Sequence, residues 1–137
     1  MPQVIHVEQK EGYLHVEVSG SFDGTKAKQF IRQILKAAKQ HALSKALVDI
    51  RKLGGAIPTA ARFELGELWA AEARTIQAAI LELPEQVKGT QFFEDVVVNR
   101  GGRIRIFTTT YGEALEWLGI EPANNSMQTT PNGAPDG

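Results

Sequence analysis

The sequence has 137 residues, of which 42% are hydrophobic and 23% are charged, and this size and composition suggest one globular domain. It contains no cysteine, which excludes a disulfide framework, a thiolate metal site and a cysteine nucleophile. The formal net charge of −1 argues against a dedicated nucleic-acid binder. Neither a signal peptide nor a bilayer-spanning apolar run is visible, so we expect a cytoplasmic protein without a transmembrane segment.

Two segments near the N-terminus alternate between apolar and polar residues. This period of two predicts half-buried strands over Val4 to Gln9 and Tyr13 to Ser19. The Lys10-Glu11-Gly12 segment between them predicts a tight turn, so the two strands should form an antiparallel hairpin.

Two registers of this hairpin are open, and they give its histidines different roles. A turn centred on Lys10-Glu11 places His6 opposite His15, where the pair could hold a metal or carry a proton. A type I′ turn centred one residue later pairs His6 with Glu17 and His15 with Glu8, as ordinary polar neighbours. We expect no metal site, because no further histidine or cysteine clusters with this pair.

The middle of the chain predicts a helix, a strand and a second helix. Apolar residues recur at helical spacing from about Thr25 to Ala42, and the short apolar run Ala46 to Ile50 is typical of an interior strand. A second helix should run to about Ala73, with Pro58 in its first turn and Thr59 as its cap. The side chains expected to face inward from it are Phe63, Leu68 and Trp69.

Three further elements follow. Ile76 to Leu81 predicts a strand that ends before Pro84. Thr90 is expected to cap a helix that Gly101 closes, and Arg103 to Thr108 is the last predicted strand. The spacing of Thr110 and Glu113 is that of a capping box, which marks the start of a final short helix.

The predicted order is ββαβαβαβα. Strands separated by helices pair in parallel through right-handed crossovers, so we expect an α/β fold with a five-stranded mixed sheet, one antiparallel edge strand and flanking helices. Residues 1–120 should form this single domain. Residues 121–137 have almost nothing to bury, and they are predicted to be a disordered tail.

Basic residues are concentrated in the first part of the chain. Residues 1–55 carry nine Lys or Arg against five Asp or Glu, whereas the remainder carries six against eleven. Much of this charge lies on one side of the first predicted helix, which could dock an acidic partner or an anionic membrane surface, or could simply be a solvated helix face. The cations between Asp23 and Asp49 are Lys26, Lys28, Arg32, Lys36, Lys39 and Lys45.

The segment Arg51-Lys52-Leu53-Gly54-Gly55 is the better candidate for a site. Two cations, flexible backbone amides and the start of a helix would suit an anion, although the same residues could form an ordinary loop with solvated charges. The glycines lack the spacing of a dinucleotide fingerprint, and no phosphate loop, nucleophile elbow or zinc-protease motif is present. We therefore expect no catalytic residue, no cofactor and no metal.

The segments Arg62-Phe63-Glu64, Asn99-Arg100-Gly101 and Glu113 to Leu118, together with the order of strands and helices, resemble the SpoIIAA-like branch of the STAS domains, which is similar to Sec14-type lipid-binding folds. This resemblance implies a domain that binds and signals. In the better-known anti-sigma-factor antagonists a kinase phosphorylates a serine at the start of the helix after the third strand. Here Arg51 to Ala60 contains no serine and only one hydroxyl, that of Thr59, for which we expect a plain capping role.

We therefore expect a non-enzymatic regulatory or interaction module that binds a partner protein, with a second copy of the chain as one such partner. The alternative is a carrier or sensor of a lipid or another small apolar or anionic ligand, which the aromatic-rich helices could enclose. Arg62 could instead form a surface ion pair with Glu64 or Glu67. The residues expected to bind the partner or ligand surround the end of the third strand: Arg51, Lys52, Gly54, Gly55, Thr59 and Arg62.

Overall fold

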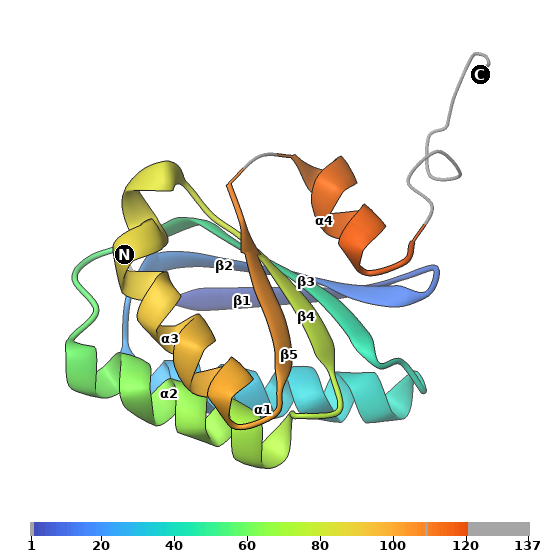
Figure 1. Ribbon diagram of the computed structural model, residues 1–137, viewed down its shortest axis with the longest axis horizontal. Helices are drawn as coiled ribbons and strands as arrows, with labels where there is room; N and C mark the ends of the chain where they lie inside the picture. Colours follow the sequence, from blue (N-terminus) through green and yellow to red (C-terminus); the bar gives the residue numbers. More distant parts are fainter. Residues whose placement is uncertain (1, 109, 121–137) are drawn as a thin grey trace.

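A five-stranded sheet with the spatial order β1-β2-β3-β4-β5 forms the centre of the molecule (Figure 1). The computed structural model describes residues 2–108 and 110–120, so the predicted tail at 121–137 lies outside the described residues. Strands β1 and β2 are antiparallel, and the other neighbours are parallel, as predicted. The strands are β1 (Val4–Lys10), β2 (Tyr13–Ser21), β3 (Lys45–Gly54), β4 (Gln77–Leu81) and β5 (Arg103–Phe107).

The helices cover the two faces of the sheet unequally. Three of them pack on one face, and the short last helix lies on the other (Figure 1). This arrangement follows from right-handed crossovers between strands that are added in one direction, because each connecting helix then returns over the same face. The helices are α1 (Gly24–Gln40), α2 (Thr59–Glu72), α3 (Val87–Asn99), which follows the 3-10 turn η1 (Pro84–Gln86), and α4 (Tyr111–Trp117).

Each face of the sheet has its own apolar core. The larger core lies under α1, α2 and α3, and Trp69 of α2 is buried in it. The smaller core lies under α4 and includes Tyr13, Leu47 and Leu115. The alternation predicted for β2 is confirmed, since Leu14, Val16 and Val18 all point into the larger core. In the described part of the chain, no helix is long and apolar enough to cross a membrane.

The hairpin register settles the question of the two histidines. His6 faces Glu17 and His15 faces Glu8, so the register that placed the histidines opposite each other is wrong. The turn is centred on Glu11 and Gly12, as the other register required. It is not of type I′, because Gly12 adopts a φ of 88° whereas Glu11 is not left-handed.

Strand β3 is longer than predicted. Its parallel pairing with β2 continues past Ile50 to Gly54, which pairs with Ser21 after a register shift between Glu17 and Ser19. The segment expected to be a loop with free backbone amides therefore belongs to the sheet up to Gly54. Only Gly55, with a φ of 86°, begins the loop to α2.

Two of the predicted helix caps are wrong. The N-cap of α2 is Pro58, without a side-chain hydrogen bond, so Thr59 is the first helical residue and caps nothing. Thr90 lies one turn inside α3, and its hydroxyl donates to the Gln86 carbonyl at 3.1 Å. The capping box at α4 is confirmed on its Thr110 side, where Oγ1 accepts from the Glu113 amide at 3.3 Å.

Candidate functional site

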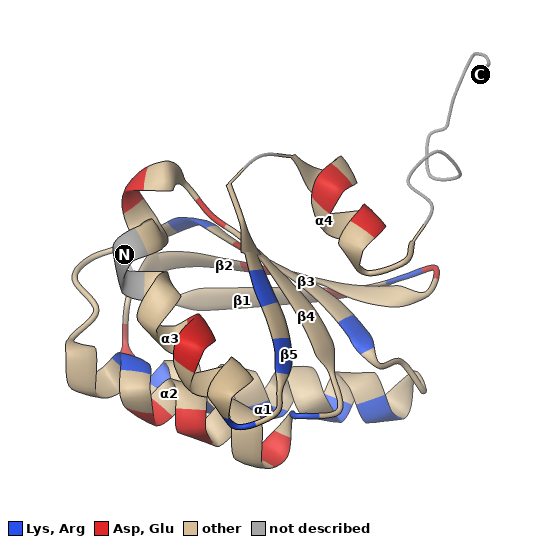
Figure 2. Cartoon of the chain, viewed as in Figure 1, with Lys and Arg blue, Asp and Glu red and all other residues tan. Residues whose placement is uncertain are grey.

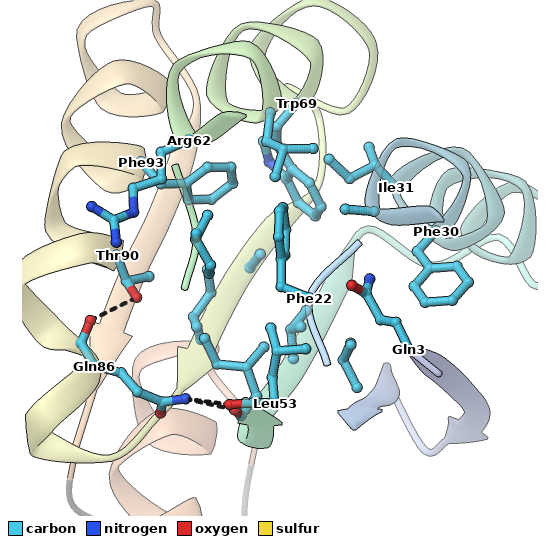
Figure 3. A pocket seen from close by; sticks show the side chains of 18 of the residues that line it. Gln3, Phe22, Phe30, Ile31, Leu53, Arg62, Trp69, Gln86, Thr90 and Phe93 are labelled. Carbon is cyan, nitrogen blue, oxygen red and sulfur yellow. Dashed lines mark hydrogen bonds between the residues drawn. The ribbon is translucent and has the colours of Figure 1, made fainter. Parts of the chain in front are cut away.

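A cavity of about 500 Å³ lies between the sheet and the helices α1, α2 and α3 (Figure 3). Its walls are mainly aliphatic and aromatic side chains from both layers, including Phe22, Ile31 and Phe93. Three of its lining residues, Gly55, Ala56 and Glu85, are exposed, and they mark its mouth beside the start of α2. Cavities of this size and character are typical of small-molecule sites.

Few polar groups line the cavity, and some of them are already bonded within the chain. The amide nitrogen of Gln86 donates to the carbonyls of Ile50 and Leu53, both at 3.1 Å, and its oxygen accepts from the Leu83 amide at 2.7 Å. Gln3 is buried, and its side-chain oxygen accepts from the Asp23 amide. The Gln86 bonds tie the end of β3 to η1 and fix one side of the mouth, while the Gln3 bond ties the N-terminal segment to the start of α1.

Two donors in the cavity wall have no partner. The Nε of Arg62 and the indole Nε1 of Trp69 are buried and bond to nothing in the described part of the chain. Both side chains extend from α2 toward the cavity (Figure 3). Buried donors in folded proteins are nearly always hydrogen-bonded, so two orphaned donors in one apolar wall are a notable feature of this site.

The structure separates the six residues that the sequence grouped. Gly55 and Arg62 line the cavity, while Thr59 is exposed on α2. Arg51 turns to the other face of the sheet, where it binds Asp49 through two hydrogen bonds of 3.0 and 2.9 Å. The predicted surface pairing of Arg62 is wrong: Glu64 pairs with Lys28 and Glu67 with Arg100. Lys52 pairs with Glu17 at 3.4 Å, and Gly54 pairs with β2.

A polar network joins β2, β3 and α4 on the face opposite the cavity. The Tyr111 hydroxyl donates to Asp49 at 2.9 Å, its oxygen lies 3.1 Å from His15 Nε2, and the Arg51 guanidinium stacks 5.3 Å from the Tyr111 ring centre. Burial would raise the pKa of Asp49, but the hydrogen bonds from Arg51 and Tyr111 outweigh it and hold that pKa below its ordinary value. Burial lowers the pKa of His15. The network therefore holds an ionised carboxylate, and it fixes α4 on the sheet.

A second buried carboxyl has no such support. Glu82 follows β4 and is 1% exposed, and neither of its carboxyl oxygens has a hydrogen-bond partner among the described residues. Burial raises the pKa of Glu82 and outweighs the opposing effect of the nearby Thr90 hydroxyl, which donates its hydrogen bond to the Gln86 carbonyl, and the Glu94 carboxylate adds to the rise.

An exposed aromatic pair lies on the outer surface of α2 and α3. Phe63 and Phe92 remain 39% and 38% exposed, their ring centres are 6.4 Å apart, and the Arg100 guanidinium lies 5.4 Å from the Phe63 ring centre. The expectation that Phe63 faces inward is therefore wrong, whereas Trp69 is buried as predicted. We call Thr59, Phe63, Phe92 and Arg100 the α2–α3 face.

The cationic side of α1 is partly neutralised by α2. Lys28 pairs with Glu64 at 3.2 Å, and Arg32 pairs with Glu72 at 3.3 Å. Figure 2 marks the basic positions along α1 and the acidic positions along the neighbouring α2. These ion pairs are exposed and add little stability, but they reduce the charge that α1 offers to another molecule.

Of the six residues predicted from the sequence only Gly55 and Arg62 line the cavity, and most of its wall was not predicted. Gln3 and Phe22 come from segments that flank the hairpin, and Gln86 comes from η1. Their side chains meet only in the folded chain, and no local pattern in the sequence marks them.

The fold is similar to those of solved anti-sigma factor antagonists. Such a protein from Mycobacterium paratuberculosis matches with a TM-score of 0.57 and 13% identity, over 86% of this chain and 95% of that chain. The unphosphorylated form of the antagonist SpoIIAA matches with a TM-score of 0.58 and 18% identity, over 85% and 98% of the two chains. An uncharacterised protein with a SpoIIAA-like fold from Shewanella loihica gives 0.56 and 20%, over 85% and 93%. At these identities the likeness shows the fold.

The family follows from the sequence itself. Residues 13–119 match the family model described as SpoIIAA-like, and the chain belongs to this family, which confirms the resemblance. A search of curated proteins found no match.

Proposed function

We propose that the chain is a non-enzymatic regulatory module that binds a partner protein through the α2–α3 face. The observation that carries this proposal is the exposed Phe63 and Phe92 pair close to the start of the helix that follows β3. Aromatic side chains and arginine are enriched in protein interfaces and supply most of their binding free energy. The structural neighbours named as anti-sigma factor antagonists support a protein as the partner.

The surroundings of the aromatic pair support the same conclusion. The ion pair Arg100–Glu67 joins the end of α3 to α2, the ion pair Lys28–Glu64 joins α1 to α2, and their side chains are about half exposed. An apolar centre with a charged rim of both signs is the usual anatomy of a protein interface. The partner should therefore offer an apolar surface for the two rings, bordered by charges of both signs.

The test compares the double variant Phe63→Ala, Phe92→Ala with Val4→Ala, which removes an exposed apolar side chain from the edge strand β1. Each tagged full-length protein captures proteins from the cells that express it, and quantitative mass spectrometry identifies those that wild type and Val4→Ala retain but the double variant loses. The Kd of such a protein, once purified, should rise by about tenfold or more for the double variant.

Circular dichroism must show that the double variant is folded. If its captured proteins equal those of wild type, the α2–α3 face is not the binding surface. A concentration-dependent dimer in analytical ultracentrifugation that only the double variant abolishes would mean that the partner is a second copy of the chain.

A further inference from the structure

We propose that the cavity under α1, α2 and α3 is a binding site for an elongated apolar carboxylic acid, whose carboxylate binds Arg62 at the mouth and whose hydrocarbon chain lies between the helices and the sheet. This inference is independent of the partner-binding function, because it concerns the inner side of α2 whereas the α2–α3 face is on its outer side.

The size and lining of the cavity determine the body of the ligand. The volume of about 500 Å³ falls within the range of roughly 300–1,000 Å³ that small-molecule sites occupy. The inner wall comprises Val18, Val48, Ala78, Ile80 and Ile104 from the sheet, and Ile31, Ile34, Leu65, Trp69 and Phe93 from the helices. Such a wall favours a hydrocarbon and penalises any polar group that finds no partner in it.

The orphaned Nε of Arg62 determines the head group. Among the described residues Arg62 forms no ion pair, although its side chain lies in the cavity wall beside the first turn of α2. A planar guanidinium binds a carboxylate with two parallel hydrogen bonds, and the positive end of the α2 dipole adds to the attraction for an anion. The acidic Glu85 at the mouth disfavours a head group with more than one negative charge.

The position of Trp69 indicates an elongated ligand. It follows Arg62 by seven positions on the same side of α2, which is two turns, or about 10 Å along the helix axis. The cavity therefore extends from the charged donor at the mouth to the indole in the core. The unbonded indole Nε1 can donate a hydrogen bond to an oxygen atom carried on the chain of the ligand.

The fluorescence of Trp69 can be used to measure binding in the cavity. The chain has two tryptophans, and Trp117 packs on the opposite face of the sheet, so the variant Trp117→Phe reports on the cavity alone. We expect dodecanoate to change the fluorescence of Trp69 saturably in this background. Dodecanol, which has the same chain without a charge, should bind about tenfold more weakly.

Three further variants test the assignment in the same background. Arg62→Gln should weaken dodecanoate about tenfold and leave dodecanol unchanged, while Arg74→Gln, which removes an exposed cation at the other end of α2, should change neither. Ala56→Trp should obstruct the mouth and weaken the binding of both probes. Because Ala56 is exposed, this variant should still fold. Its binding is measured by calorimetry, because the introduced tryptophan would add to the fluorescence of Trp69.

The absence of saturable binding of either probe, with unchanged amide chemical shifts around the cavity, would refute the site. Equal binding of dodecanoate to wild type and Arg62→Gln would refute the role of Arg62. Circular dichroism of each variant confirms that it is folded. None of these results depends on whether the α2–α3 face binds a protein.

Discussion

Glu82 and Asp49 are two buried carboxyl residues in different surroundings. The Glu82 carboxyl is buried without a hydrogen bond, whereas the equally buried Asp49 accepts hydrogen bonds from Arg51 and Tyr111. The two carboxyls therefore have pKa values displaced in opposite directions, that of Glu82 upward and that of Asp49 downward. Burial alone does not decide the charge of a carboxyl, because the partners that it finds can reverse the effect.

The raised pKa of Glu82 makes stability depend on pH in a definite direction. Above the ordinary glutamate pKa of 4.5 the unfolded chain loses this proton while the folded chain keeps it, so stability falls as pH rises toward the folded pKa. Glu82→Gln should match wild type near pH ~4 and exceed it by roughly 1–3 kcal/mol near pH ~8. Urea unfolding across this range checks the prediction.

The lowered pKa of His15 makes stability rise with pH, which is opposite to the effect of Glu82. The test therefore compares the free energy of unfolding of the variant with that of wild type at each pH. The exposed Glu116→Gln serves as the surface control. A Glu82→Gln difference that does not grow with pH would show that Glu82 is not held protonated.

Two of the residues predicted to bind a ligand or partner are bound within the protein. Arg51 and Lys52 looked like loop cations available to a ligand, but each binds a carboxylate of its own sheet. These carboxylates are Asp49, two positions back in the same strand, and Glu17, which lies on β2. The pairing with Glu17 depends on the parallel register of two strands, which local composition does not encode. Arg62 was expected to bind a ligand or partner because it follows the carboxyl end of the third strand, and it lines the cavity together with Gly55.

At the scale of elements, the close contact of α2 and α3 depends on Gly66. A Cβ at this position would lie 2.7 Å from Val96 Cγ1 and 2.8 Å from Val96 Cβ, so alanine requires the helices to move apart. Overpacking of this kind costs about 1–3 kcal/mol, which exceeds the roughly 1 kcal/mol gained in helix propensity. We expect Gly66→Ala to lower the free energy of unfolding by about 1–2 kcal/mol, measured by urea denaturation.

Gly112 provides the matched control, since it also lies in a helix. A Cβ there would meet Thr110 Oγ1 at 3.5 Å, an ordinary contact. Gly112→Ala should therefore leave stability unchanged or raise it slightly. If both variants have the same effect, the close approach at Gly66 does not limit helix packing.

Helix starts give a second prediction at this scale. Thr110 accepts a hydrogen bond from the Glu113 amide, whereas Thr59 caps nothing. Thr110→Ala should therefore cost about 1 kcal/mol in the free energy of unfolding, and Thr59→Ala close to nothing. Thermal unfolding of the two variants in parallel checks this. A loss of equal size for Thr59→Ala would mean that its hydroxyl supports the helix after all.

At the scale of the whole molecule, the order of elements and the pairing of strands were predicted correctly from the sequence. Segments that alternate between apolar and polar residues predicted the hairpin, and apolar runs between amphipathic helices predicted the parallel strands. The length of β3 was underestimated because Arg51 to Gly55 has the composition of a loop, whereas pairing with β2 holds it extended to Gly54. The cavity could not be predicted, because its wall is assembled from segments of four strands and three helices that meet only after folding.

The spatial order of the strands is also their order along the chain. No strand has to be inserted between two that have already paired, so every new strand is added to the open edge left by the one before it. Synthesis on the ribosome releases the segments in this same order, and domains generally acquire structure from the N-terminal side during translation. The sheet can therefore grow at the pace of translation, with α4 as the last helix to close its second face.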